Sequence, residues 1–289
     1  MSFASIERSR QKGKPVNLFY FRYGEASSAF YAYTDCETAI ERNGVTYQPL
    51  PIDRGKIVTK GSLDKQALEV RMTLNVGLAE HFRVYPPTSV ANLTIYQGHI
   101  SDPDAQFLVV WTGRILSSKR TDNELILTCE PIRTTLKRVG LRRHYQYSCM
   151  HVLYGPMCRA NKAAATKEVV VAQVQATALI LQAGWTTPEL KQKYVGGMVE
   201  WENAANDTEL RTILRTAGDK IVLSGPTRNI IAGQTVRIVL GCNHNFRQND
   251  DKTIHEDTDC FFVHDNIQNY GGCPWIPTEN PVGRLNQYY

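Results

Sequence analysis

Hydrophobic and polar residues alternate in the first half of the chain. Every second position of one segment is apolar, namely Leu68, Val70, Met72, Leu74 and Val76. A period of two is typical of a β-strand with one buried face. Similar segments, separated by turn-forming residues, cover 16–21, 28–34, 92–96, 106–115 and 124–130. Short strands at this spacing predict a barrel or a sandwich.

The second half has the same β character with less regular connections. Strand-like runs cover 168–181, 196–201, 220–225 and 234–241. Segment 186–195 predicts a short helix, with Thr187 as its N-cap and Pro188 in its first turn. The tail from Asn266 is rich in Gly, Pro and Asn, so we expect no regular element there. The predicted fold class is therefore mainly β, with a few short helices.

Segment 131–143 separates the two halves. Pro131 could open a short helix, and the basic residues that follow, without any acid, are Arg133, Lys137, Arg138, Arg142 and Arg143. The segment is either a solvated basic helix or a face that meets an acidic partner. We therefore predict a barrel- or sandwich-like domain over 1–130, a linker over 131–143 and a second β-rich domain over 144–289.

Composition narrows the class of protein. The chain has 289 residues, of which 42% are hydrophobic, and a net charge of +5, which is too small to indicate nucleic-acid binding alone. Its N-terminus lacks the apolar core of a secretory signal, and no segment reaches the roughly 18 apolar residues of a membrane span. We expect synthesis in the cytoplasm and no membrane insertion. In that reducing compartment, the seven cysteines favour a metal site over disulfides.

Two cysteine pairs lie in irregular segments beside strands. Cys149 and Cys158 form the first pair, and Cys242 and Cys260 form the second. Neither spacing is the short C-x2-C of zinc ribbons or a ferredoxin run, so the spacing alone is a weak signal. Thiolate ligands suit zinc or an iron–sulfur cluster, whereas isolated cysteines are often small buried hydrophobes. Cys129, on the same strand face as Leu125 and Leu127, is expected to be of that second kind.

The cysteine segments resemble those of a phage family. "LRRHYQYSCMHVLYGPMC" (141–158) holds a basic approach and two cysteines, and "GCNHNF" (241–246) is followed by "CFFVHDNIQNYGGCPWIP" (260–277). Together they are similar to the siphophage tail-tip proteins, which include the minor tail protein L of phage lambda and the hub protein of gene transfer agents. The resemblance covers roughly 125–280. Glycine in "NYGG" is expected to allow a positive φ or a close backbone approach at Gly271 or Gly272.

The resemblance implies a [4Fe–4S] cluster bound by Cys149, Cys158, Cys242 and Cys260. Relatives have the second pair much closer together, and an insertion over 248–258 separates it here, so Cys273 is an alternative fourth ligand. Three roles are open for His151, His244 and His264: metal ligand, hydrogen-bond donor beside the cluster, or loop packing. Zinc is the alternative metal.

The resemblance also implies a structural role in the virion. It suggests a homotrimer at the tail tip that contacts the distal tail protein, the central fibre or hub protein and the tape-measure protein, with DNA passing through the channel. No G-x-S-x-G, H-E-x-x-H, Walker A or G-x-G-x-x-G motif indicates an enzyme. Two other hypotheses stand: a four-cysteine zinc module that contacts nucleic acid through 131–143, and an iron–sulfur electron-transfer protein.

Overall fold

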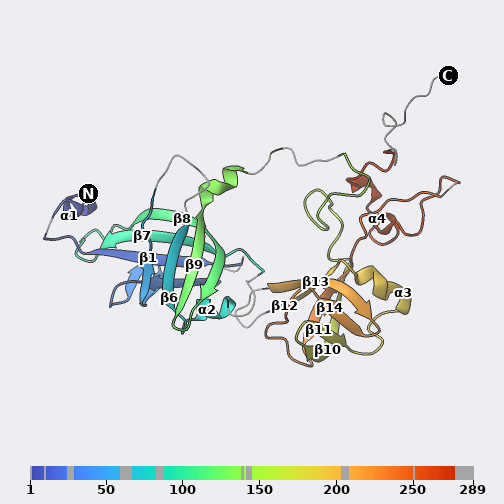
Figure 1. The fold of residues 1–289 in the computed structure, drawn as a ribbon, viewed down its shortest axis with the longest axis horizontal. Helices are drawn as coiled ribbons and strands as arrows, with labels where there is room; N and C mark the ends of the chain where they lie inside the picture. The colour runs from blue at the N-terminus through green and yellow to red at the C-terminus, as the bar shows by residue number, and fades with distance from the viewer. Residues whose placement is uncertain are drawn as a thin grey trace, which may run out of the picture. The chain divides into compact units, whose positions relative to one another are not determined.

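The structure is a computed structural model that describes residues 2–9, 11–24, 29–58, 67–82, 88–137, 140, 145–202, 208–249 and 251–276. The chain forms two compact units. The first takes in residues 1–138 and 202–209, and the second takes in 139–201 and 210–289. The first unit therefore includes much of the segment that the sequence assigns to a linker. The prediction of a mainly β protein is confirmed (Figure 1).

The first unit is built on one nine-stranded sheet with the order β3-β4-β2-β1-β7-β8-β9-β6-β5. Its strands are β1 (Pro15–Arg22), β2 (Phe30–Thr34), β3 (Ile40–Arg42), β4 (Val45–Pro49), β5 (Ile52–Arg54), β6 (Leu68–Thr73), β7 (Asn92–His99), β8 (Leu108–Arg120) and β9 (Glu124–Pro131). Each run predicted in the first half contains a strand, whereas β3, β4 and β5 were not predicted.

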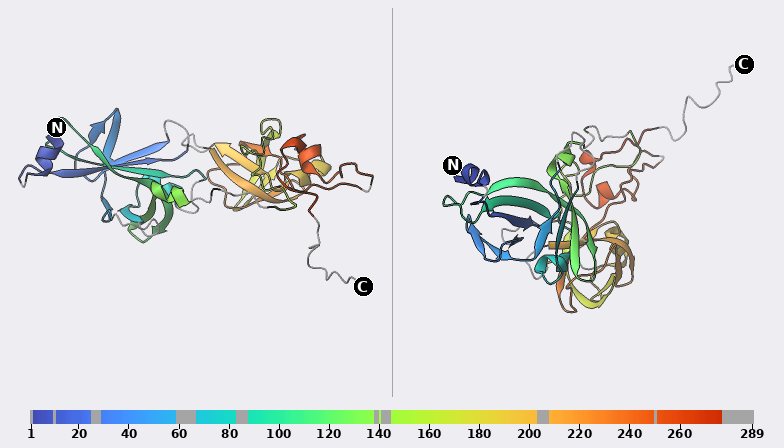
Figure 2. Two further views of the ribbon diagram at one scale, coloured as in Figure 1. Left: turned by 90° about the horizontal axis from the view of Figure 1, so that it is seen from above. Right: turned by 60° about the vertical axis from the view of Figure 1, so that its left-hand side comes forward.

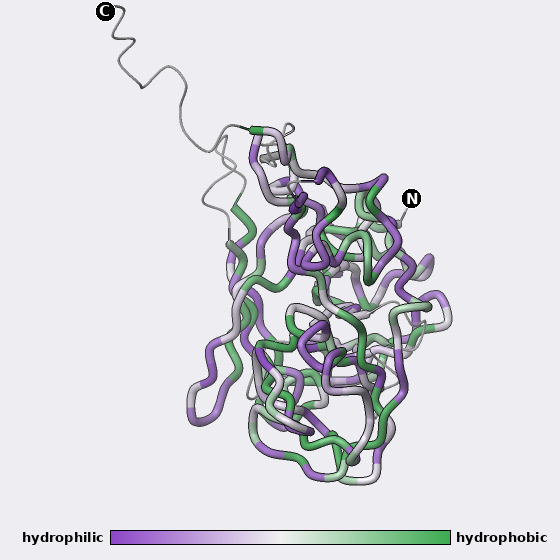
Figure 3. The backbone as a smooth tube through the Cα atoms, turned by 90° about the vertical axis from the view of Figure 1, so that its right-hand side faces the viewer, coloured by the Kyte–Doolittle hydropathy of each residue, from purple (hydrophilic) through white to green (hydrophobic). Residues whose placement is uncertain are grey.

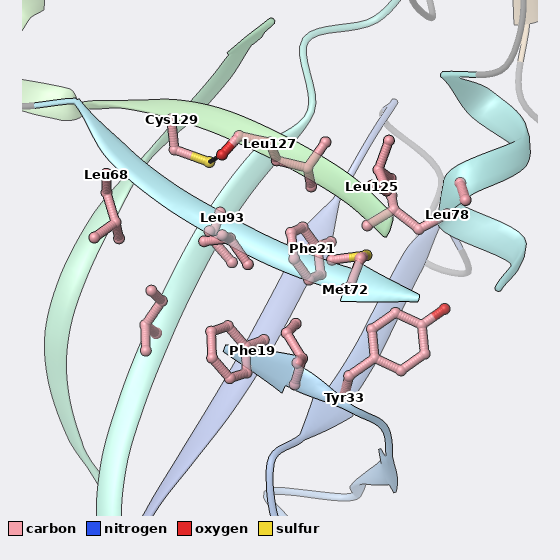
Figure 4. Packing of buried hydrophobic residues seen from close by; sticks show 14 of the residues in the cluster. Phe19, Phe21, Tyr33, Leu68, Met72, Leu78, Leu93, Leu125, Leu127 and Cys129 are labelled. Carbon is pink, nitrogen blue, oxygen red and sulfur yellow. Dashed lines mark hydrogen bonds between the residues drawn. The ribbon is translucent and has the colours of Figure 1, made fainter. Parts of the chain in front are cut away.

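Side chains from alternate positions of these strands form the core of the first unit. Figure 4 shows Phe19 and Phe21 of β1 packed with Met72 of β6 and with Leu125 and Leu127 of β9. Cys129 is fully buried among them, as the alternation along β9 predicts. Its thiol is thus part of the hydrophobic core and lies in a different unit from the paired cysteines.

Short helices complete the first unit. They are α1 (Ser2–Glu7), α2 (Gly77–His81) and the 3-10 helix η1 (Ile132–Lys137). η1 is the short helix expected after Pro131. The predicted basic residues Arg138, Arg142 and Arg143 lie outside the described residues, so the structure does not test a basic face there.

The second unit contains a closed barrel with the order β10-β11-β14-β13-β12-β15. Its strands are β10 (Thr166–Gln175), β11 (Ala178–Leu181), β12 (Met198–Glu202), β13 (Thr208–Ala217), β14 (Lys220–Leu223) and β15 (Thr235–Val239). Register shifts in β10 and β13 mark bulges, which help a sheet to curve and close. Two views of the barrel appear in Figure 2.

The hydrophobic core of the barrel includes the buried side chains of Val171, Leu179, Val199, Trp201 and Ile238. Hydrophobic and hydrophilic stretches alternate along the backbone, as Figure 3 shows by colour. The predicted run 168–181 is two strands, because the chain turns between β10 and β11. Thr187 does occupy the N-cap position of α3 (Pro188–Lys191), but its side chain makes no capping hydrogen bond.

The remaining short elements of the second unit lie in its connections. They are η2 (Gln192–Tyr194), α4 (Asp259–Phe262) and η3 (Ile267–Asn269). The tail from Asn266, where no regular element was expected, begins with the 3-10 helix η3, so that prediction is wrong at this point. Residues 270–276 contain no helix or strand, and residues 277–289 lie outside the described part. Every helix in the described part of the chain is too short or too polar to cross a bilayer.

Candidate metal centre

Both cysteine segments leave the barrel at the same end. β10 and β15 are antiparallel neighbours, and Thr166 at the start of β10 pairs with Val239 at the end of β15. The chain that enters β10 carries Cys149 and Cys158, while the chain that leaves β15 carries Cys242 and Cys260. This strand pairing therefore brings the two segments side by side (Figure 1).

Hydrogen bonds between main-chain groups fasten the two segments together. Cys149 N–H donates to the His244 carbonyl at 2.8 Å, and Leu240 N–H donates to the Ala165 carbonyl at 3.0 Å. The Tyr154 hydroxyl donates to the Leu240 carbonyl at 2.6 Å. The first segment thus follows the second away from the barrel.

The four paired cysteines share one neighbourhood. Burial, reinforced by electrostatic repulsion from Cys242, Cys149 and Cys158, raises the pKa of the Cys260 thiol to about 12. Burial, with smaller contributions from Asp259, Cys149 and Cys158, raises the pKa of Cys242 to about 11. Both thiols of the first pair therefore act electrostatically on both thiols of the second pair.

Three of these sulfurs accept N–H groups. The His244 main-chain N–H lies 3.4 Å from Cys242 Sγ, and the Gly271 main-chain N–H lies 3.2 Å from Cys149 Sγ. The Asn266 side-chain amide lies 3.6 Å from Cys158 Sγ. In contrast, the Cys260 thiol donates to the Asn266 carbonyl at 3.3 Å. N–H donors stabilise negative charge on sulfur, so these contacts partly offset the burial that disfavours the thiolate form.

The four paired cysteines are of the ligand type that suits zinc or an iron–sulfur cluster. Within the described residues, no three His, Cys, Asp or Glu side chains are arranged to bind one metal ion. A tetrahedral zinc ion needs its sulfur ligands about 2.3 Å from one point. In a [4Fe–4S] cluster each cysteine binds a different iron, so the four sulfurs lie further apart.

The three candidate histidines contact main-chain carbonyls. His151 Nδ1 donates to the Asn269 carbonyl at 2.9 Å, His244 Nδ1 to the Cys149 carbonyl at 3.2 Å, and His264 Nε2 to the Gly241 carbonyl at 2.7 Å. Each ring therefore joins a loop near one cysteine to another stretch of backbone. Of the three roles left open by the sequence, these contacts favour loop packing.

Cys273 and Cys36 are two further free cysteines. Cys273 is held by its main-chain N–H, which donates to the Gln146 carbonyl at 2.8 Å. Its thiol is not among the groups that shift the pKa of Cys242 or Cys260. The Cys36 Sγ lies 3.4 Å from the Thr38 hydroxyl, in the first unit.

The glycines of "NYGG" permit a close approach of backbone segments. Neither Gly271 nor Gly272 has a positive φ. A Cβ on Gly271 would lie 2.5 Å from His151 Nε2, and one on Gly272 would overlap the Tyr147 carbonyl oxygen. Of the two reasons expected for glycine here, the structure therefore supports close packing.

Two important residues were missed in the sequence. Asp259 directly follows the insertion 248–258, in a polar part of the sequence, yet it is 5% exposed. Its carboxylate accepts Lys193 Nζ at 2.6 Å and the Asn243 main-chain N–H at 2.9 Å, so it joins the second cysteine segment to η2. The other is Asn266, which contacts two cysteines. No pattern in the sequence predicts these contacts.

Comparison with known proteins gives two family models, each covering less than half of the chain. Residues 20–161 match "Baseplate hub protein, N-terminal attachment domain", and residues 192–280 match "Phage conserved hypothetical protein BR0599". These matches support a phage tail or baseplate protein. The first includes Cys149 and Cys158, and the second includes Cys242 and Cys260. The expected location in a virion agrees with them.

Two individual proteins are also similar to this chain. An uncharacterized protein of Xylella fastidiosa (strain 9a5c) is 26% identical over 165 residues, which span 53% of this chain but only 34% of that relative. A chain in the structure "Virion of native gene transfer agent (GTA) particle" has a TM-score of 0.77 at 18% identity, covering 99% of this chain and 96% of its own. The latter likeness shows a shared fold. None of these descriptions mentions a metal.

Proposed function

We propose that this protein is a structural subunit of the tail tip or baseplate of a siphophage or phage-like particle. In this role it links the distal tail to the central fibre, and a structural [4Fe–4S] cluster holds its C-terminal half. The match to a baseplate hub attachment domain supports the first part, because that match covers most of the first unit. The role is one of assembly rather than catalysis.

The convergence of four thiols at one end of the barrel carries the proposal of a cluster. The segments bearing them contain few strands or long helices, so they have little core of their own. Metal binding can supply the folding energy that such segments lack. When bound, the cluster would cross-link four points of the chain.

Cys149, Cys158, Cys242 and Cys260 are the proposed ligands. The choice of Cys260 over Cys273 rests on its electrostatic contact with the other three thiols. The main-chain N–H groups of His244 and Gly271 would donate to two of the bound sulfurs. Their fixed positions would orient the thiolates and partly balance their charge.

The resemblance to tail-tip proteins suggests the partners. We propose that three copies form a ring that contacts the distal tail protein, the central fibre or hub protein and the tape-measure protein. DNA would pass through the axial channel without sequence-specific recognition. The net charge of +5 is compatible with acidic neighbours.

Complementation tests this function. In a phage or phage-like element that carries the gene, deletion should abolish complete, infectious particles, and the wild-type gene should restore them. Cys242→Ser should restore them poorly, whereas Cys36→Ser should restore them as well as the wild type. Purified particles that lack this protein but remain infectious would contradict the proposed role.

A further inference from the structure

Asn266 joins the segments that carry two of the candidate ligands. It is 8% exposed and immediately precedes η3. Its Nδ2 donates to the Cys158 carbonyl at 2.6 Å and to Cys158 Sγ at 3.6 Å. Its own carbonyl accepts the Cys260 thiol at 3.3 Å, and its main-chain N–H donates to the Cys260 carbonyl at 2.8 Å.

The hydrogen-bond network fixes the orientation of this amide. Asn266 Oδ1 accepts Asn269 Nδ2 at 2.7 Å, while Nδ2 faces two acceptors on Cys158. Exchanging the amide oxygen and nitrogen would place an oxygen against the Cys158 carbonyl and leave two acceptors facing each other. The side chain therefore presents an N–H to the Cys158 sulfur in a defined direction.

We propose that Asn266 is a positioning residue that donates to the Cys158 sulfur, holds it near Cys260 and thereby raises the reduction potential of the cluster. This inference rests on the [4Fe–4S] centre proposed above. Hydrogen bonds to cluster sulfurs and the local charge both set such potentials. An N–H donor stabilises the electron-rich reduced state, so its loss makes reduction harder.

Two substitutions test the role of the Asn266 N–H donors, one of them without a change in side-chain shape. Asn266→Asp keeps the shape but replaces the N–H donors with an acceptor and adds negative charge. Asn266→Ala removes the donors without adding charge. Asn245→Asp is the matched control, since it makes the same chemical change at an exposed position of the second cysteine segment.

The experiment is a redox titration of the full-length, anaerobically reconstituted protein with dithionite, followed by visible absorption and electron paramagnetic resonance. The midpoint potential should shift to more negative values in Asn266→Ala and further in Asn266→Asp. The shift in Asn245→Asp should be much smaller. Iron content is measured on the same samples.

Each outcome decides between the claims. A wild type that binds no cluster would overturn both the proposed centre and this inference. A wild type with a cluster and Asn266 variants of unchanged potential and iron content would overturn the inference alone. Both variants could instead lose the cluster. If their metal-free forms then unfold with the same free energy as the metal-free wild type, the result supports a role of Asn266 at the cluster sulfurs. Equally large losses of metal-free stability would instead make Asn266 a purely structural residue and overturn the inference.

Discussion

The main-chain N–H of Gly271 donates to the Cys149 sulfur at 3.2 Å, although 122 residues separate the two. This contact ties the "NYGG" turn to the first cysteine segment. It exists because strands β10 and β15 bring both segments to one end of the barrel. The candidate metal centre is therefore a consequence of the barrel topology.

Cys260→Ser and Cys273→Ser distinguish the two candidates for the fourth ligand. Cys260 lies among the other three thiols, so its substitution should remove most of the iron from purified protein. Cys273→Ser should retain the wild-type iron content. Iron per chain, measured after anaerobic purification, checks this prediction, and the reverse result would assign the site to Cys273.

Gly271→Ala should destabilise the second unit. The new methyl group would collide with the His151 ring, which donates to the Asn269 carbonyl. Overpacking of this kind costs about 1–3 kcal/mol. Urea unfolding of the metal-free protein measures the cost. Gly140→Ala is the control, because its methyl would meet no atom of the described residues within 4 Å.

Asp259→Asn should weaken the attachment of the second cysteine segment. The substitution removes the charge that pairs with Lys193, while leaving the side-chain volume almost unchanged. Hydrogen bonds to charged groups are worth about 2 kcal/mol, so a loss of that order is expected. Asp257→Asn is a matched control, since its exposed pair with Arg247 should contribute below about 1 kcal/mol. Equal losses in the two variants would argue against a buried anchoring role for Asp259.

Alkylation of the metal-free protein should report the raised pKa of Cys260. Burial, reinforced by the neighbouring thiols, raises this pKa to about 12, so the unreactive neutral thiol persists well above pH 9. In the urea-unfolded chain the same thiol ionises near its ordinary value of about 8.5. The folded state therefore loses stability as the pH rises from about 9 towards 12. Iodoacetamide labelling followed by mass spectrometry should show slow reaction of Cys260 at pH 9 in folded protein and fast reaction in unfolded protein.

Much of the fold follows from local patterns in the sequence. Alternation identifies β6 and β9 because each buries every second side chain against one core. β1 is recognised by its apolar run instead, since it buries Val16 and Leu18 in one cluster and Phe19 and Phe21 in another. Alternation misses β13, whose buried positions include the charged residues Glu209 and Arg211. It also cannot tell which unit closes into a barrel, since closure depends on pairing between strands that are distant in sequence.

The candidate site, like the fold, could be predicted from the sequence only in part. Residue type and resemblance identify the four cysteines, and glycine marks the close approach at Gly271. Asp259 and Asn266 could not be predicted, because they lie in polar segments and acquire their roles only through long-range partners. Asp259 and Asn266 become buried only because the fold brings the two cysteine segments together.

Metal analysis of the anaerobically purified wild-type protein tests the central claim most directly. We predict about four iron atoms and a similar amount of acid-labile sulfide per chain, with broad visible absorption that dithionite bleaches. One zinc per chain without visible absorption, or four free thiols without metal, would contradict a cluster shared by Cys149, Cys158, Cys242 and Cys260.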